Sequence, residues 1–196
     1  GFILGISLSV SAQKEKWTSL FDGKTLSGWS KKGGNATYAV ANGEIVGTTL
    51  ENTPNTFLCS DKLYDNFILE LELSLGGEMN SGIQFRSNVR KSNDGKEVVY
   101  GPQCEVDPSA RAWSGGIYDE QRRQWLYNLN FNPEGQKAFK GNGAWNKYRI
   151  EAIDGQIRTW INDIPTANLV DTLVEKGFIA LQVHSIGNDQ KLAGKT

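Results

Sequence analysis

Side chains able to do acid–base chemistry recur at alternating positions of three short segments. Residues 81–86 read Ser-Gly-Ile-Gln-Phe-Arg, residues 103–107 read Gln-Cys-Glu-Val-Asp, and residues 181–184 read Leu-Gln-Val-His. Successive side chains of an extended strand point to opposite faces, so each segment directs its apolar residues to one face and its polar residues to the other. The polar set is Gln84, Arg86, Gln103, Glu105, Asp107, Gln182 and the only histidine, His184.

If these three strands are neighbours, one sheet face carries an acid, a base, a cation and several amides. Glu105 and His184 are then the candidate acid–base pair, and Arg86 is the candidate cation. Such groups suit a pocket for a polar, uncharged ligand. Each residue also has an ordinary explanation: a lone histidine is more often a surface residue, Arg86 and Glu105 can form a cross-strand ion pair, and strand glutamines often bond only water.

Aromatic side chains follow in the next part of the chain. Trp113, Tyr118, Trp125 and Tyr127 lie within fifteen residues and are interleaved with charged residues. Rings beside polar groups offer a sugar both a stacking surface and hydrogen-bond partners, although any one ring can instead pack a loop onto the sheet. The candidate substrate-binding residues from the aromatic pattern are Tyr118, Glu120, Trp125 and Trp160, the last on a separate predicted strand as a second platform or a core residue.

Composition narrows the classes of partner. The 22 acidic and 21 basic side chains leave a formal charge of -1, so neither nucleic acid nor an anionic membrane surface is a favoured partner. Two cysteines and one histidine cannot supply the four ligands of a usual zinc site, and no dense aspartate cluster indicates calcium. We therefore predict no cofactor, and calcium stays open only for a binding module, in which Asp107 or Asp119 could be ligands. Cys59 and Cys104 can form a disulfide or stay as two buried thiols, and their positions in the sequence leave both open.

Period-two alternation runs through the chain, and no long stretch keeps a helical apolar period. This pattern predicts one all-β domain over residues 16–196, built as a two-sheet sandwich or jelly roll. Asp154-Gly155 is the clearest signal for a two-residue hairpin. The predicted strands cover residues 38–46, 56–60, 67–75, 81–87, 103–107, 115–118, 145–153, 156–161 and 177–184.

Residues 1–15 are treated separately from the domain. Residues 1–12 are uncharged and largely apolar and end in Val-Ser-Ala, which is typical of the hydrophobic part of a signal peptide and its cleavage site. Twelve residues are too few to span a bilayer, and a buried first strand is the alternative. We therefore expect an exported protein, periplasmic or extracellular, with no membrane span.

Six segments form a recognisable combination. They are residues 20–29 (LFDGKTLSGW), 80–87, 99–107, 114–120, 143–150 and 179–184. Together they resemble the 3-keto-disaccharide hydrolase family over about residues 17–186. This resemblance implies a concanavalin A-like jelly-roll sandwich of two antiparallel sheets with a concave ligand-binding face, distantly similar to laminarinase-type glucanases.

Two positions depart from the family pattern. Ser185 stands where a glycine usually follows the histidine, and the final strand with its Arg-Asn-Ile motif is not among these 196 residues. If the protein lacks that strand, a sheet edge is left exposed.

The resemblance also implies a hydrolase or lyase acting on glycosides that carry a ketone at C3. The ketone acidifies the C2 hydrogen, so a base can remove it, the C1 leaving group is expelled by elimination, and water then adds. This needs a base near C2, a cation or donor at the keto oxygen, and an acid at the glycosidic oxygen. Glu105 and His184 take the acid and base roles in either order, and Arg86 stabilises the developing enolate. The residues assigned to orienting the sugar or the catalytic groups are Gln84, Gln103, Asp107 and Gln182.

Two other functions fit parts of the sequence. Glucanases of this fold use two carboxylates about 5–5.5 Å apart in a Glu-x-Asp-x-x-Glu run, but Ala110 stands where the second glutamate belongs. A non-catalytic carbohydrate-binding module of the laminin G type needs rings and polar groups without an acid–base pair. Convergence of Glu105, Arg86 and His184 in one concave pocket would favour the enzyme over the module.

Overall fold

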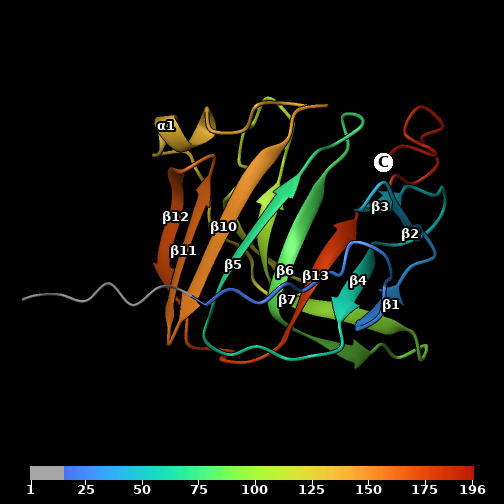
Figure 1. The fold of residues 1–196 in the computed structure, drawn as a ribbon, viewed down its shortest axis with the longest axis horizontal. Coiled ribbons are helices and arrows are strands. Elements are labelled where there is room, and N and C mark those ends of the chain that lie inside the picture. Colours follow the sequence, from blue (N-terminus) through green and yellow to red (C-terminus); the bar gives the residue numbers. More distant parts are fainter. Residues whose placement is uncertain (1–15) are drawn as a thin grey trace, which may run out of the picture.

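Two antiparallel sheets face each other in the computed structural model, which describes residues 16–196 (Figure 1). The larger sheet contains, in spatial order, β1 (Trp29–Gly33), β4 (Thr56–Ser60), β13 (Phe178–Val183), β6 (Ser81–Lys91), β7 (Glu97–Val106), β8 (Ile117–Glu120) and β9 (Gln124–Tyr127). The smaller sheet contains β12 (Ile164–Val170), β11 (Gln156–Ile161), β10 (Asn146–Ile153) and β5 (Phe67–Leu73). A separate hairpin, β2 (Thr37–Ala41) with β3 (Glu44–Thr48), and a short helix, α1 (Pro133–Gln136), complete the elements.

The predicted jelly-roll sandwich is confirmed, and the differences from prediction follow from local chemistry. Asp154-Gly155 joins β10 to β11 as expected, with Ile153 opposite Gln156. The predicted strand 38–46 is two strands, because Asn42 and Gly43 turn the chain with positive φ. The strands that alternation did not predict, β1, β9 and β12, are all edge strands with a single hydrogen-bonded neighbour in their sheets. An edge strand needs no regular apolar face, so its sequence carries little of the signal.

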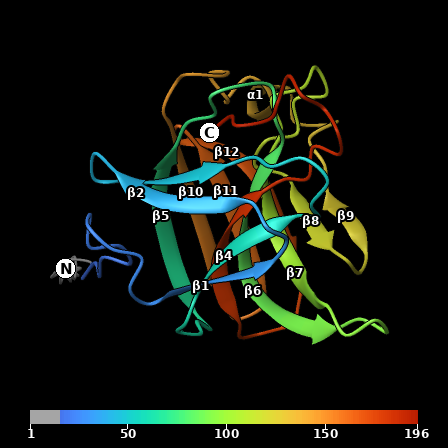
Figure 2. The ribbon, with the colours of Figure 1, turned by 90° about the vertical axis from the view of Figure 1, so that its right-hand side faces the viewer.

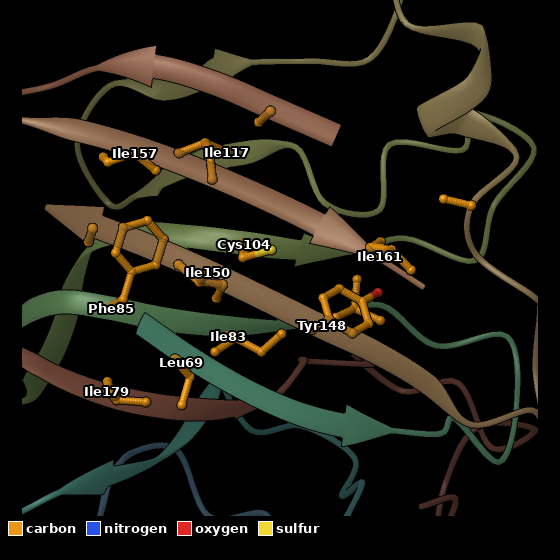
Figure 3. Packing of buried hydrophobic residues seen from close by; sticks show 14 of the residues in the cluster. Leu69, Ile83, Phe85, Cys104, Ile117, Tyr148, Ile150, Ile157, Ile161 and Ile179 are labelled. Carbon is orange, nitrogen blue, oxygen red and sulfur yellow. The ribbon is translucent and has the colours of Figure 1, made fainter. Parts of the chain in front are cut away.

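The hydrophobic core fills the space between the sheets (Figure 3). Residues paired across neighbouring strands share a face, and Ile83 of β6 lies opposite Cys104 of β7 on the face that points to the smaller sheet. Cys59 belongs to a second cluster with Phe57 and Phe178. The two cysteines therefore lie in different clusters, and both are free thiols. Burial raises the pKa of Cys59 to about 12, so this thiol stays protonated and unreactive at neutral pH.

Figure 2 views the larger sheet from its outer side, with the smaller sheet behind it and the β2–β3 hairpin in front. None of the helices among residues 16–196 is long and apolar enough to cross a membrane. The signal-peptide prediction concerns residues 1–15, which lie outside the described residues, and it stays a prediction.

A bulge in β6 overturns one expectation about the polar face. The register of β6 with β7 shifts between Gln84 and Asn88, and Arg86 adopts a positive φ of 46°. The alternation of side chains between the two faces therefore breaks after Gln84. The expectation that the Arg86 side chain lies on the same face as that of Gln84 is wrong. Gly177 permits the close approach, because a Cβ there would lie 2.2 Å from the Arg86 carbonyl carbon.

The Arg86 side chain instead ties the two sheets together. It is 1% exposed, and its guanidinium donates hydrogen bonds to the end of β10 and the segment before β5. The acceptors are Asp65 O (2.8 Å), Asp154 O (2.6 Å), Asn66 Oδ1 (3.0 Å) and Ala152 O (3.1 Å). Arg86 is thus a buried cation held mainly by carbonyl oxygens, a structural role in place of the predicted catalytic one.

We expect Arg86→Met to lower the free energy of unfolding by about 3–5 kcal/mol, because the carbonyl oxygens lose a charged donor and stay buried. Urea unfolding followed by circular dichroism measures the loss. Arg90→Met is the matched control on the same strand, since Arg90 is exposed and makes one hydrogen bond, to Gln121 O; it should change stability by less than about 0.5 kcal/mol. Equal losses in both variants would contradict the role given to Arg86.

Candidate functional site

A pocket of about 350 Å³ hollows the outer face of the larger sheet. It is lined by Asn55, Asn80, Gln103, Glu105, Arg111, Tyr118, Glu120, Gln121, Trp125, Gln182 and His184. The volume lies at the small end of the range of protein ligand sites, about 300–1,000 Å³. Apart from the rings of Tyr118 and Trp125 and the histidine, the lining consists of amides, two carboxylates and one guanidinium.

Strand register explains why these residues meet. In the larger sheet, β13, β6, β7 and β8 are consecutive neighbours. Gln103 lies opposite Tyr118, and Glu105 lies opposite Gly82. Because directly paired residues point to the same face, Gln103, Glu105 and Tyr118 share the outer face. Three segments far apart in sequence thereby contribute to one pocket.

Glu105 is the buried carboxyl of the pocket. The residue is 4% exposed; Asn80 Nδ2 donates to its Oε1 (2.5 Å), and the Gln103 amide lies 3.0 Å from its Oε2. Burial raises the pKa of Glu105 above its usual range, and the hydrogen bond from Asn80 opposes this only in part. A carboxyl with a raised pKa can hold a proton and act as a general acid.

His184 follows the end of β13 and has a defined tautomer. Its Nδ1 lies 2.7 Å from Ser185 O. A carbonyl oxygen only accepts hydrogen bonds, so Nδ1 carries the proton and the neutral ring keeps a free lone pair on Nε2. Asn55 holds this loop, because its Oδ1 accepts from Ser185 N (2.8 Å) while its Nδ2 donates to Glu120 Oε1 (3.2 Å). The histidine is therefore arranged as a base at Nε2.

Arg111 is the cation that lines the pocket. Its Nε donates to Asp107 Oδ2 (2.8 Å), and its guanidinium carbon lies 4.6 Å from the Trp113 ring centre and 5.0 Å from that of Trp125. The two indoles pack edge to face, 4.7 Å apart. The wall of the pocket thus combines a positive charge with aromatic rings.

Three predicted site residues do not line the pocket, besides Arg86. Asp107 is buried beneath it, where its side chain also accepts from Ser109 N (3.1 Å). Burial opposes its ionisation, but hydrogen bonds from Ser109 and Arg111 outweigh this and lower the pKa of Asp107. Gln84 is fully buried behind Gln103, with 2.9 Å between their amides.

Trp160 belongs to the opposite side of the sandwich. It lies on β11 of the smaller sheet, opposite Arg149 in the register. Its neighbours Thr159 and Ile161 are fully buried, so the indole points outward, 5.9 Å from the guanidinium carbons of Arg149 and Arg158. Two sheets separate it from the pocket, and the expectation that it binds the same ligand is wrong.

Four lining residues were not assigned to the site from sequence: Asn55, Asn80, Arg111 and Gln121. All four lie outside the strands, where alternation gives no information about direction. Only Arg111 had a local signal, because it lies among the aromatic residues. Among residues 16–196, no group of three histidine, cysteine, aspartate or glutamate side chains is placed to hold a metal ion.

The comparisons agree with this fold. The sequence pattern of the 3-keto-alpha-glucoside-1,2-lyase-like domain matches residues 16–191, so the chain belongs to that family and the predicted relationship is confirmed. No match was found among curated proteins.

Solved structures share the architecture at low sequence identity. A candidate glycosyl hydrolase from Parabacteroides distasonis is similar with a TM-score of 0.59 and 18% identity, covering 86% of this chain and 87% of that one. The carbohydrate-binding module CBM66 from Bacillus subtilis is similar with a TM-score of 0.56 and 15% identity, covering 81% of this chain and 88% of that one. A protein with a galectin-like fold from Bacillus subtilis is similar with a TM-score of 0.58 and 10% identity, covering 80% of this chain and 83% of that one. At these identities the similarity shows the fold alone.

Gly82 provides a test of the pocket that removes no functional group. A Cβ at Gly82 would lie 2.2 Å from Gln103 Cδ, so Gly82→Ala must displace Gln103 from Glu105. We expect the side-chain amide signals of Gln103 in a ¹H–¹⁵N NMR spectrum to shift while the circular dichroism spectrum stays unchanged. Gly77→Ala is the control, because the nearest atom to its Cβ would be 3.6 Å away. Unchanged Gln103 signals in Gly82→Ala would contradict this contact.

Proposed function

We propose that the protein cleaves glycosides carrying a ketone at C3, by elimination across C1 and C2 followed by addition of water. The observation that carries this proposal is the convergence of Glu105, His184 and Arg111 on one pocket. They supply the three roles the reaction needs: an acid, a base and a cation. Arg111 replaces Arg86 in the role of cation. Membership of the 3-keto-alpha-glucoside-1,2-lyase-like family supports the choice of substrate class.

The proposed chemistry assigns each role to one atom. His184 Nε2 removes the C2 hydrogen, and the C–H electron pair forms an enolate whose oxygen is stabilised by Arg111. The enolate collapses to a C1–C2 double bond as the C1–oxygen bond breaks, and Glu105 gives its proton to the departing oxygen. Water then adds across the double bond, with hydroxyl at C1 and hydrogen at C2, which completes a net hydrolysis.

Two buried amides lie beside Glu105. Gln84 and Gln103 are 2.9 Å apart, and Gln103 Nε2 donates to Glu105 Oε2 (3.0 Å). Burial raises the pKa of Glu105 by more than the hydrogen bonds from Asn80 and Gln103 lower it. Burial is thus the cause that favours the acid form of Glu105.

Removal of either catalytic group should slow cleavage strongly. We expect Glu105→Gln and His184→Ala each to lower the rate about 10²- to 10⁴-fold, the usual contribution of a general acid or base, with an unchanged circular dichroism spectrum. Incubation with a panel of 3-keto-disaccharides, followed by mass spectrometry, should show a 2-hydroxyglycal intermediate with the wild-type protein. Activity retained in both variants would exclude this site.

The acid role of Glu105 predicts the pH profile. Because Glu105 must be protonated to act, the rate should fall as pH rises through its raised pKa. Gln103→Met removes the donor to Glu105 Oε2, which destabilises the carboxylate, raises this pKa further and moves the alkaline limb to higher pH. Asp107, Arg111 and His184 are unchanged by this substitution, so their charges do not account for a shift. An alkaline limb that stays in place would contradict the contribution of Gln103.

A non-catalytic carbohydrate-binding module is the second candidate. The Trp125 ring in the pocket, against which Trp113 packs edge to face, favours it, as does the fold shared with CBM66. A module would bind sugars without consuming any substrate of the panel, and Glu105→Gln would then leave binding unchanged. Cleavage of an unoxidised β-glucan would instead support the conventional two-carboxylate mechanism.

A further inference from the structure

Gln182 has a buried amide without a partner. The residue lies on β13, the strand between β4 and β6, and is 5% exposed. Among the described residues, neither its Nε2 nor its Oε1 has a hydrogen-bond partner. Buried amide groups left in this state destabilise the protein, so native structures rarely retain them without a reason.

Each of the other pocket amides already has at least one hydrogen-bond partner. Gln103 lies between Gln84 and Glu105, and Asn80 donates to Glu105. Asn55 is held by Ser185 and Glu120, and Gln121 Nε2 lies 3.4 Å from Glu120 Oε1. The main chain of Gln182 is held as well, because its carbonyl oxygen accepts from Ser81 Oγ (2.8 Å). The unused hydrogen-bonding capacity of the Gln182 amide is therefore available to a ligand in the pocket.

The chemistry of an amide defines the group that would satisfy it. The nitrogen donates and the oxygen accepts, so the ligand must both accept and donate, as hydroxyl groups do. A carboxylate or a phosphate dianion only accepts and would leave Oε1 unpaired. The surrounding charge acts in the same direction, because Glu120 lines the pocket while the positive charge of Arg111 is already paired with Asp107.

We propose that Gln182 is the residue that anchors the sugar, through hydroxyl groups that both donate and accept, and that the pocket selects uncharged sugar units over uronates and sugar phosphates. This inference rests on the proposed function in that both use the same pocket. Binding does not require cleavage, so the two can fail separately. Gln182 is thereby a specificity-determining residue, and the structural cost of its buried amide is recovered when the ligand binds.

Replacement of the amide should separate binding from stability. Gln182→Met keeps the shape of the side chain and removes both polar atoms. We expect it to weaken the binding of methyl glucoside and its 3-keto derivative about 10- to 100-fold, while the melting temperature stays the same or rises. Gln182→Glu keeps the shape and removes the donors, and it should also weaken binding. Isothermal titration calorimetry and thermal unfolding measure the two effects.

Two controls distinguish recognition from a structural role. Gln156→Met removes an amide of the smaller sheet that bonds Asn168, and it should leave binding unchanged. Methyl glucuronide and glucose 6-phosphate should bind the wild-type protein at least about tenfold more weakly than methyl glucoside.

Three results would overturn the inference: wild-type affinity in both Gln182 variants, equal affinity for neutral and anionic sugars, or no saturable binding of any neutral sugar. A wild-type protein that binds methyl glucoside through Gln182 but cleaves no 3-keto-glycoside would overturn the proposed reaction and leave the inference standing.

Discussion

The antiparallel register of β13, β6, β7 and β8 is the constraint on which both the core and the pocket depend. Paired residues share a face, so one side of these strands is closed by the smaller sheet and the other is left to solvent and ligand. A shift of one residue in any strand would exchange the two faces. Ile83 and Cys104 would then face the pocket, and Glu105 would be buried in the apolar core.

The bulge at Arg86 shows how this constraint is relaxed at one end of the sheet. Beyond Gln84 the alternation stops, and the side chain that would have continued the polar face turns into the protein. Its guanidinium then joins the two sheets through carbonyl oxygens. A single irregular residue thereby separates the part of β6 that supports the pocket from the part that holds the sandwich together.

Inside the pocket, hydrogen bonds from neighbouring residues hold Glu105 and His184. Gln84 lies against Gln103, whose amide nitrogen donates to Glu105. On the other side, Ser185 and Asn55 hold His184 in one tautomer. Glu105 and His184 are thus both held by neighbouring residues, whereas the amide of Gln182 has no hydrogen-bond partner among the described residues.

The order of residues by itself determined the all-β fold, the hairpin at Asp154-Gly155 and the common face of Gln103, Glu105 and Gln182, because these follow from local alternation and turn chemistry. Only the tertiary structure decided that Arg86 leaves this face, that Trp160 lies on the other sheet and that Arg111 is the pocket cation. A bulge depends on the partner strand as well as on local sequence, and loop residues such as Arg111 and Asn55 are placed by contacts with distant segments. The site residues on strands were therefore predictable from the sequence, and those on loops were not.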